Sequence, residues 1–379
     1  MCYNIPMQPT QTRAVAAIDI GTTTIQAQLV DLHTGQTLNT FSALNDQRVF
    51  GADVISRISA AQNGKLDDLF TTINNQVKNI LMSFTQKLNL PCIEKCAVSG
   101  NTTMLHLFCR VDPSAMGAAP YTPVFLEERH FSGKEFSLPA ENIILLPGIS
   151  AFVGADITAG LVFVDIMGKG EDALFVDLGT NGEIAVWKNS EKRLYCCSTA
   201  AGPCFEEADS CGLRASDFID TVAEMRRQNA IDETGALAEK YSQTGFPVTN
   251  GKFITQKDVR QFQLAKSAIY SGIRTICRTA GIEIKNLKSA YVAGGLGFSL
   301  NPENAAAVGL LPKEFTGSSA AVKTVICGNT SLKGTVESLK DANFLSRCYD
   351  LINCAETVDL ANSKFFTAAF EHNMLFNTD

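Results

Sequence analysis

An internal duplication is the feature that most constrains how this chain can fold. The segment 15–27, VAAIDIGTTTIQA, recurs in the second half as 173–185, ALFVDLGTNGEIA. Each copy predicts an apolar strand, an Asp near its end, a Gly-Thr turn and a second strand. Two weaker sequence similarities follow in the same order: 97–102 resembles 291–296, and 147–154 resembles 327–334. Three pairs of similar segments in the same order predict two similar α/β halves.

The spacing of apolar residues predicts the same order of elements in both halves. Strands in quick succession are expected at 14–20, 24–31 and 35–43, and again at 173–178, 182–188 and 193–198. Helices are expected at 54–62, 67–88 and 256–281, alternating with strands near 93–98, 142–146 and 287–293. Segments 111–141 and 226–254 have little periodicity and are expected to be insertions or loops. This order of strands and helices favours mixed sheets, antiparallel at one edge and parallel elsewhere, with helices on both faces.

The composition excludes several functional classes. Hydrophobic residues make up 45% of the chain, which is typical of a protein with large cores rather than a disordered one. The 32 basic and 39 acidic residues give a net charge of -7, which argues against a dedicated nucleic-acid binder. Since no apolar run reaches about 18 residues and no secretion signal is evident, we expect no membrane association and a cytoplasmic location.

The 12 cysteines are not spaced like those that ligate iron-sulfur clusters or zinc. The tightest group is Cys196, Cys197, Cys204 and Cys211. It leaves two interpretations open: a metal site, or thiols that act as small hydrophobes in apolar strands. The second is favoured, so no iron-sulfur cluster is expected in this chain.

The two Gly-Thr turns carry the residue types of phosphate-binding loops. The first contains Gly21, Thr22 and Thr23, and the second Gly179, Thr180 and Asn181. Glycine lets the backbone turn sharply, and successive amides and hydroxyls can then surround an anion. One such motif could be a simple hairpin turn, but two copies in equivalent positions favour phosphate binding.

Two aspartates and a glycine-rich turn accompany these loops. Asp19 and Asp177 each lie two residues before the turn glycine, and either carboxylate could attract a hydrated Mg²⁺. Gly294, Gly295 and Gly297 follow a predicted strand and would permit close approach of a purine and its ribose. A tight strand-to-helix turn is the simpler interpretation of these glycines.

These loops, together with the paired glycines at 148 and 154 and at 328 and 334, resemble the five-part pattern of the acetate and sugar kinase/Hsp70/actin superfamily. The resemblance covers roughly residues 14–340. Four further segments make the chain similar to the nucleotide-binding domain of the reductive activators of corrinoid proteins: 51–58 (GADVISRI), 99–104 (SGNTTM), 202–206 (GPCFE) and 254–260 (ITQKDVR). Those activators use ATP to drive one-electron reduction of an inactive Co(II) corrinoid to Co(I).

The resemblance implies an α/β fold with duplicated ribonuclease H-like halves and a nucleotide cleft between them. The first half would span 13–168, with 345–379 packing back onto it, and the second 169–344. ATP and Mg²⁺ would be the cofactors, with Asp19 and Asp177 holding the ion through water. The two Gly-Thr loops would contact the β- and γ-phosphates.

The resemblance assigns further roles by position. Gly294, Gly295 and Gly297 would border the adenosine, and Glu206 would lie near the ribose. Asp156 would orient or deprotonate the attacking water. Asn101 is expected first to cap a helix, with phosphate or partner contact as the alternative. Asp53 and Arg57, one helical turn apart, are expected to form an ordinary ion pair.

The chain departs from the family pattern at two points. Glu207 stands where Gly is expected, and no cluster-binding run of cysteines is present. The expected partners are therefore a corrinoid protein and a separate electron donor, and a homodimer is left open. A small-molecule kinase and a non-enzymatic actin-like scaffold remain alternatives to an ATPase.

Overall fold

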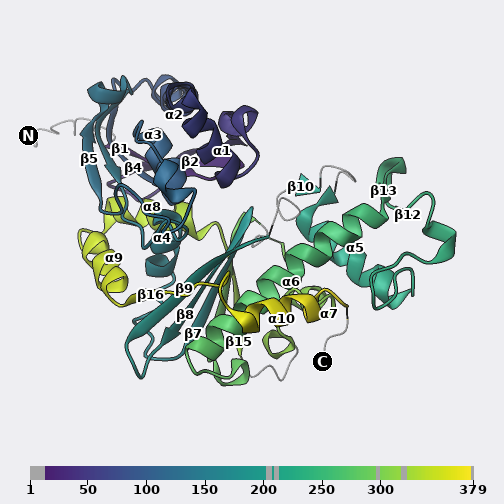
Figure 1. Ribbon diagram of the computed structural model, residues 1–379. Helices are drawn as coiled ribbons and strands as arrows, with labels where there is room; N and C mark the ends of the chain where they lie inside the picture. Colours follow the sequence, from purple (N-terminus) through teal and green to yellow (C-terminus); the bar gives the residue numbers. More distant parts are fainter. Residues whose placement is uncertain (1–12, 202–206, 209–212, 296–298, 317–321, 377–379) are drawn as a thin grey trace, which may run out of the picture. The chain divides into compact units, whose positions relative to one another are not determined.

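The protein contains two compact units, each with its own six-stranded sheet. The computed structural model describes residues 13–201, 207–208, 213–295, 299–316 and 322–376 (Figure 1). One unit comprises Met1–Pro147 and Gly334–Leu345, and the other Gly148–Lys333 and Ser346–Asp379. This division follows contacts and does not test where the duplicated halves begin, so the boundaries 13–168 and 169–344 stay predictions.

The described part of the first unit forms a mixed sheet. Its strands are β1 (Ala14–Ile20), β2 (Thr24–Asp31), β3 (Thr37–Leu44), β4 (Ile93–Gly100), β5 (Arg129–Ser132) and β6 (Ala140–Leu145). They lie in the order β3-β2-β1-β4-β6-β5. β1 pairs antiparallel with β2 and parallel with β4, and β6 continues the parallel part. β5 adds an antiparallel edge strand inside the segment 111–141, where insertions or loops were expected.

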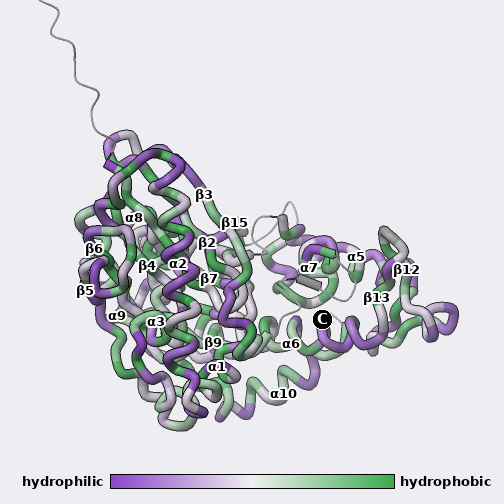
Figure 2. Tube along the Cα trace, turned by 90° about the horizontal axis from the view of Figure 1, so that it is seen from above, coloured by the Kyte–Doolittle hydropathy of each residue, from purple (hydrophilic) through white to green (hydrophobic). Residues whose placement is uncertain are grey.

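Every residue of β1 is buried, which explains why the sequence reads as one continuous apolar run there. The helices of this unit are α1 (Val54–Ala60), α2 (Leu66–Leu88) and α3 (Thr102–Phe108). The buried residues of α2 recur at helical spacing, including Leu69, Ile73, Val77 and Phe84. Figure 2 shows the resulting alternation of hydrophilic and hydrophobic positions along α2.

The second sheet repeats the order and directions of five strands of the first, and the sixth strand of each sheet lies at a different edge. Its strands are β7 (Ala173–Leu178), β8 (Asn181–Lys188), β9 (Arg193–Ala200), β14 (Ser289–Ala293), β15 (Lys323–Gly328) and β16 (Ala355–Thr357). They lie in the order β15-β14-β7-β8-β9-β16. β7 is antiparallel to β8 and parallel to β14, as β1 is to β2 and β4. The predicted duplicated α/β fold with mixed sheets is confirmed.

Helices cover both faces of the second sheet. Leu174, Val176 and Leu178 of β7 face a core that includes α5 (Ala215–Arg227) and α6 (Gln256–Thr279). Ala173 and Phe175, at alternate positions, face a second core with α4 (Ala155–Phe163) and Leu351 of α9 (Phe344–Asn353). The predicted continuous apolar strand is therefore buried on both sides.

The remaining elements are short or lie near the C-terminus. They are β10 (Glu207–Ala208), β11 (Leu213–Arg214), β12 (Phe246–Pro247), β13 (Phe253–Ile254), α7 (Pro302–Ala307), α8 (Thr330–Lys340) and α10 (Lys364–Asn373). α10 lies along α6 (Figure 1). The C-terminal helix thus packs within the second unit and not on the first half as expected, because side chains of α6 bind the carbonyl groups at its end.

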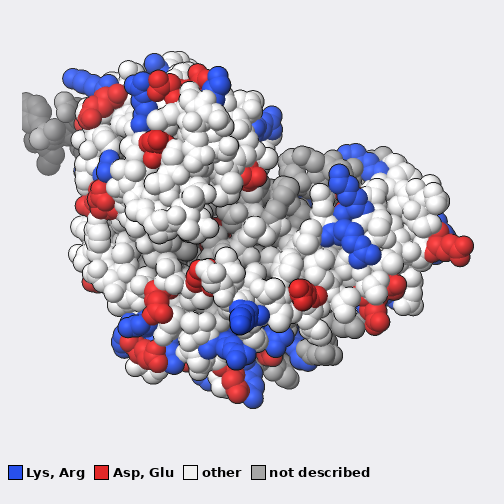
Figure 3. Space-filling model, in the orientation of Figure 1, with Lys and Arg blue, Asp and Glu red and all other residues white. Residues whose placement is uncertain are grey.

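The surface carries both signs of charge. On the face shown in Figure 3, Lys and Arg lie interspersed with Asp and Glu. Within the part of the chain that the structure describes, no helix has both the length and the apolarity needed to cross a bilayer.

Candidate functional site

The first Gly-Thr loop is the turn between β1 and β2. The amide of Gly21 donates to the carbonyl of Thr24 over 3.0 Å. A Cβ atom at Gly21 would lie 2.6 Å from that same oxygen, so glycine is required by the turn. Asp19, in β1, and Thr22, in the turn, are 9% and 6% exposed. The strand thus delivers a nearly buried carboxylate to the base of the loop.

Asn45 and Arg57 hold the carbonyl groups of this loop. The side-chain amide of Asn45 donates to the carbonyl of Gly21 over 2.9 Å, and its backbone amide donates to the carbonyl of Thr23 over 2.7 Å. The Nη2 atom of Arg57 donates to the carbonyl of Thr22 over 2.6 Å. All three backbone carbonyls of Gly21, Thr22 and Thr23 therefore have protein donors.

The prediction that Asp53 and Arg57 form an ordinary helical ion pair is wrong. Asp53 caps α1, accepting from the backbone amide of Ser56 over 2.7 Å. Arg57 is fully buried and donates through Nε to the carbonyl of Gly51 over 3.1 Å, in addition to its bond with Thr22. The helix places Arg57 on its inner face, where its donors reach backbone carbonyls of the first loop and of Gly51.

The predicted capping role of Asn101 is confirmed, whereas its contact with phosphate or a partner stays a prediction. Asn101 caps α3, because its Oδ1 atom accepts from the backbone amide of Met104 over 2.9 Å. Its Nδ2 atom also donates to the hydroxyl of Thr22 over 2.8 Å. The segments 51–58 and 99–104, which carried the finer resemblance, thus both contact the first loop.

The second Gly-Thr loop joins β7 to β8. The amide of Gly179 donates to the carbonyl of Asn181 over 3.0 Å, which closes the turn around Thr180. Asp177 is paired in register with Glu183 of β8 on one side and with Ala293 of β14 on the other. The second loop therefore carries its aspartate at the junction of three central strands.

Three carboxylates of the second unit lie close enough for their charges to interact. Glu183 is 9% exposed, and the hydroxyl of Ser198 donates to it over 3.1 Å. Burial first, and then the negative charges of Asp156 and Asp177, raise the pKa of Glu183 well above its ordinary value. The charges of Asp156 and Asp177 thus both act on Glu183, which the sequence analysis missed, and the roles assigned to the two aspartates stay predictions.

Gly294 approaches the second loop closely. Its φ of +96° lies in the region that favours glycine. A Cβ atom there would lie 2.3 Å from the carbonyl oxygen of Leu178 and 2.8 Å from Oδ1 of Asp177. Among the residues that the structure describes, a Cβ atom at Gly295 would meet nothing within 4 Å.

Two residues predicted to lie near the nucleotide, Gly297 and Glu206, are outside the described residues, as are Cys204 and Cys211. Cys196 and Cys197 are buried in β9, and burial raises the pKa of the Cys196 thiol to about 12. Among the residues that the structure describes, no three His, Cys, Asp or Glu side chains are arranged to hold a metal ion directly. The four-cysteine group as a whole is not tested.

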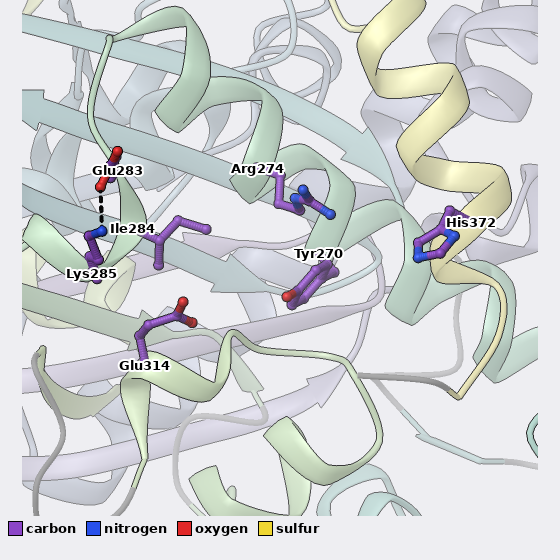
Figure 4. Close-up of a pocket in the computed structure, with 7 residues that line it drawn as sticks. All are labelled: Tyr270, Arg274, Glu283, Ile284, Lys285, Glu314 and His372. Atoms are coloured by element: carbon purple, nitrogen blue, oxygen red, sulfur yellow. Dashed lines mark ion pairs between the residues drawn. The ribbon is translucent and has the colours of Figure 1, made fainter. Parts of the chain in front are cut away.

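A polar surface pocket of about 440 Å³ lies elsewhere in the second unit. Its lining comes from α6, from the end of α10 and from two connecting segments (Figure 4): Tyr270, Arg274, Glu283, Ile284, Lys285, Glu314 and His372. Lys285 forms an ion pair with Glu283 at 2.9 Å. None of the residues predicted for nucleotide binding lines this pocket, so it takes no part in the candidate site.

Family models match nearly the whole chain. The RACo middle region matches residues 14–169, and the C-terminal domain of RACo, described as the ASKHA domain, matches 171–219 and 211–379. The corrinoid activation enzyme RamQ of Eubacterium limosum is 30% identical, covering 95% of this chain and 70% of RamQ. The [Co(II) methylated amine-specific corrinoid protein] reductase of Methanosarcina barkeri is 27% identical, covering 90% and 72%.

A solved structure shows the same fold. The reductive activator for corrinoid,iron-sulfur protein superimposes with a TM-score of 0.86 at 27% identity. The match covers 97% of this chain and 67% of that one. The chain described here thus spans between two thirds and three quarters of the length of these relatives.

Proposed function

This chain belongs to the family defined by the RACo middle region and its ASKHA C-terminal domain, and on that premise we propose that it is an ATP-hydrolysing activator of a corrinoid protein. In this proposal, ATP drives conformational changes that allow one electron to reduce the Co(II) corrinoid of the partner to Co(I). The electron comes from a separate redox protein. The named relatives, a corrinoid activation enzyme and a corrinoid protein reductase, support this assignment.

The convergence of Asp156, Asp177 and Glu183 beside the second loop is the observation that best supports nucleotide chemistry. Asp177 lies two residues before the turn glycine. The charges of Asp156 and Asp177 both raise the pKa of Glu183. Acidic oxygens near a phosphate loop suit Mg²⁺, which keeps most of its water ligands.

Each predicted residue has a defined part in this proposal. Asp19 and Asp177 hold the waters of Mg²⁺, which neutralises phosphate charge when it is bound. The amides and hydroxyls of Thr22, Thr23 and Thr180 donate to phosphate oxygens. Asp156 orients the attacking water.

The test is a reconstitution with a Co(II) corrinoid protein under anaerobic conditions. A low-potential chemical reductant supplies the electron, and absorption spectroscopy follows the conversion of Co(II) to Co(I). We expect reduction to require the chain, Mg²⁺ and ATP together, and phosphate release to rise when the corrinoid protein is added. An ATP analogue that resists hydrolysis is the control for turnover.

Two results would contradict the proposal. One is Co(I) formation at the same rate with and without ATP. The other is ATP consumption that depends on a small hydroxylated substrate and ignores the corrinoid protein, which would establish a kinase.

A further inference from the structure

The carbonyl groups of the first loop all point toward the protein interior. Those of Gly21 and Thr22 accept from Asn45 and Arg57. These two donors lie on one side of the loop, because both also contact the sulfur of Met104, at 3.8 Å and 3.0 Å. The two peptide groups are therefore oriented the same way.

This orientation fixes the direction of the loop amides. In a trans peptide the N–H points opposite to the C=O of the same peptide group. Because the carbonyls of Gly21 and Thr22 face Asn45 and Arg57, the amides of Thr22 and Thr23 face the other way. Successive amides that point to one side form a site for an anion such as phosphate.

The hydroxyl of Thr22 is oriented by a similar contact. It accepts from Nδ2 of Asn101 over 2.8 Å, so its proton is the part that can be donated to a ligand. Asn101 is itself fixed by capping α3. Thr22 is thus held through its carbonyl by Arg57 and through its hydroxyl by Asn101.

Arg57 is suited to this task by its chemistry. It is permanently charged, and a charged donor forms a stronger hydrogen bond than a neutral one. It is also fully buried, so water does not compete for its bond with Thr22. Its other neighbours include the carbonyl of Gly51 and, at 3.4 Å, Oε1 of Gln47, and these keep the guanidinium in place.

We propose that Arg57 and Asn101 are positioning residues of the nucleotide site, which turn the amides and hydroxyl of the first loop toward the phosphates of ATP. This proposal rests on the function proposed above. Neither residue touches the nucleotide; each acts through Thr22. The positioning matters for ligands that carry the outer phosphates and not for the nucleoside part.

The test compares Arg57→Met, Arg57→Lys and wild type by calorimetric titration with Mg²⁺-ATP and with AMP. We expect Arg57→Met to bind ATP about 10-fold more weakly, the effect of losing one hydrogen bond from a charged donor. AMP affinity should be unchanged, and Arg57→Lys should recover part of the loss. Arg226→Met is the matched control, since Arg226 also donates to a backbone carbonyl, that of Ile231, at 3.0 Å.

Asn101→Ser keeps the test decisive if Arg57→Met does not fold. Serine still caps α3 but cannot reach the hydroxyl of Thr22. We expect a weaker ATP complex, and less protection of segment 14–25 from hydrogen exchange when ATP is added, with circular dichroism unchanged.

The outcomes separate the two proposals. Equal ATP affinity in wild type and in every folded variant would overturn the positioning roles while leaving the proposed function intact. An equal loss of ATP and AMP affinity would also overturn them, because it would indicate a general structural effect. Failure of the wild type to bind ATP would overturn the proposed function and this inference together.

Discussion

Asp177 and Glu183 are direct partners across the β7–β8 ladder, so the second Gly-Thr loop has two carboxylates at its base. A hydroxyl from β9, that of Ser198, binds Glu183. Burial, followed by the negative charges of Asp156 and Asp177, raises the pKa of Glu183 well above its ordinary value.

Replacing Asp177 tests its assignment to Mg²⁺. Asp177→Asn removes the charge but keeps the size of the side chain, so the fold should be retained. We expect Mg²⁺-ATP affinity to fall by about 10- to 100-fold, as is usual when a group that orients metal-bound water is lost. Calorimetric titration measures the change, and Asp19→Asn should behave alike.

Asp172→Asn is the matched control for this change. Asp172 immediately precedes β7, at the opposite end of the strand from Asp177, and accepts from the backbone amide of Asn189 over 2.8 Å. It should bind Mg²⁺-ATP normally. Wild-type affinity in both Asp19→Asn and Asp177→Asn would show that the two loops were assigned wrongly.

Gly294 should tolerate no side chain. Gly294→Ala would force Cβ against the carbonyl of Leu178 and the carboxylate of Asp177 in an unfavourable backbone conformation. We expect a loss of about 1–3 kcal/mol in the free energy of unfolding, the usual cost of overpacking. Denaturant unfolding measures it. Gly295→Ala, where a Cβ atom meets nothing within 4 Å, should unfold like wild type.

The order of elements and the repeated loops could be predicted from the sequence because both depend on local pattern. The strands around Asp19 and Asp177 are continuous apolar runs that end in a Gly-Thr turn. The same pattern predicted mixed sheets with these strands inside them, since a strand buried on both faces must lie inside a sheet. It did not predict the antiparallel edge strand β5. Asn101 could also be predicted as a helix cap, because capping needs only neighbouring residues.

Glu183 could not be found by comparing the two copies, because their turns differ in length by one residue. Gly21 bonds to the third residue after it and Gly179 to the second. Asp19 therefore faces Gln26, whereas Asp177 faces Glu183. A comparison without gaps aligns Glu183 with an apolar isoleucine. A lone acidic residue at the start of an otherwise apolar strand was the available signal.

Arg57 was misjudged for a different reason. Its spacing from Asp53 is that of an ordinary helical ion pair, and that pattern cannot reveal which face of the helix is buried. Its bond to Thr22 joins residues far apart in the sequence. Contacts of this kind depend on tertiary packing and leave no periodic trace.

The attachment of α10 to α6 depends on a buried lysine. Lys266 is 1% exposed, and its Nζ atom donates to the carbonyls of Asn373 and Leu375, both at 2.6 Å. Burial, helped by the positive charge of Arg226, lowers the pKa of Lys266 to about 7. A neutral amine keeps two N–H donors, enough for both carbonyls.

This lysine should make stability depend on pH in a defined direction. The unfolded chain binds the proton up to a pKa of about 10.4, whereas the folded chain releases it near 7. Between these values the unfolded state holds more protons, so the free energy of unfolding should rise with pH, by up to about 1.4 kcal/mol per unit. Below pH 7 this contribution should be flat.

Lys266→Met should remove that slope, which urea unfolding at several pH values can measure. Lys257→Met, on an exposed position of the same helix, is the control and should keep it. Identical slopes in Lys266→Met and wild type would show that Lys266 is charged in the folded protein throughout this range.

The last prediction concerns the coupling of nucleotide to partner. ATP differs from ADP by the γ-phosphate, which the Gly-Thr loops are proposed to contact. A ligand can shift a conformational equilibrium only through a difference in its affinity for the two states. If the corrinoid protein prefers one state, its affinity and that of the nucleotide are coupled by the same free energy in both directions.

Coupling of this kind typically changes affinity by about 5- to 150-fold. We therefore expect the corrinoid protein to bind the wild-type chain with different affinities when it holds an ATP analogue and when it holds ADP. In Asp177→Asn these two affinities should be equal. Titration of the labelled partner, followed by fluorescence anisotropy, measures each affinity. The reciprocal titration of nucleotide with and without partner must give the same ratio, because the cycle is closed. Equal affinity of the partner for both wild-type forms would mean that ATP acts on the chemistry of reduction without controlling the encounter.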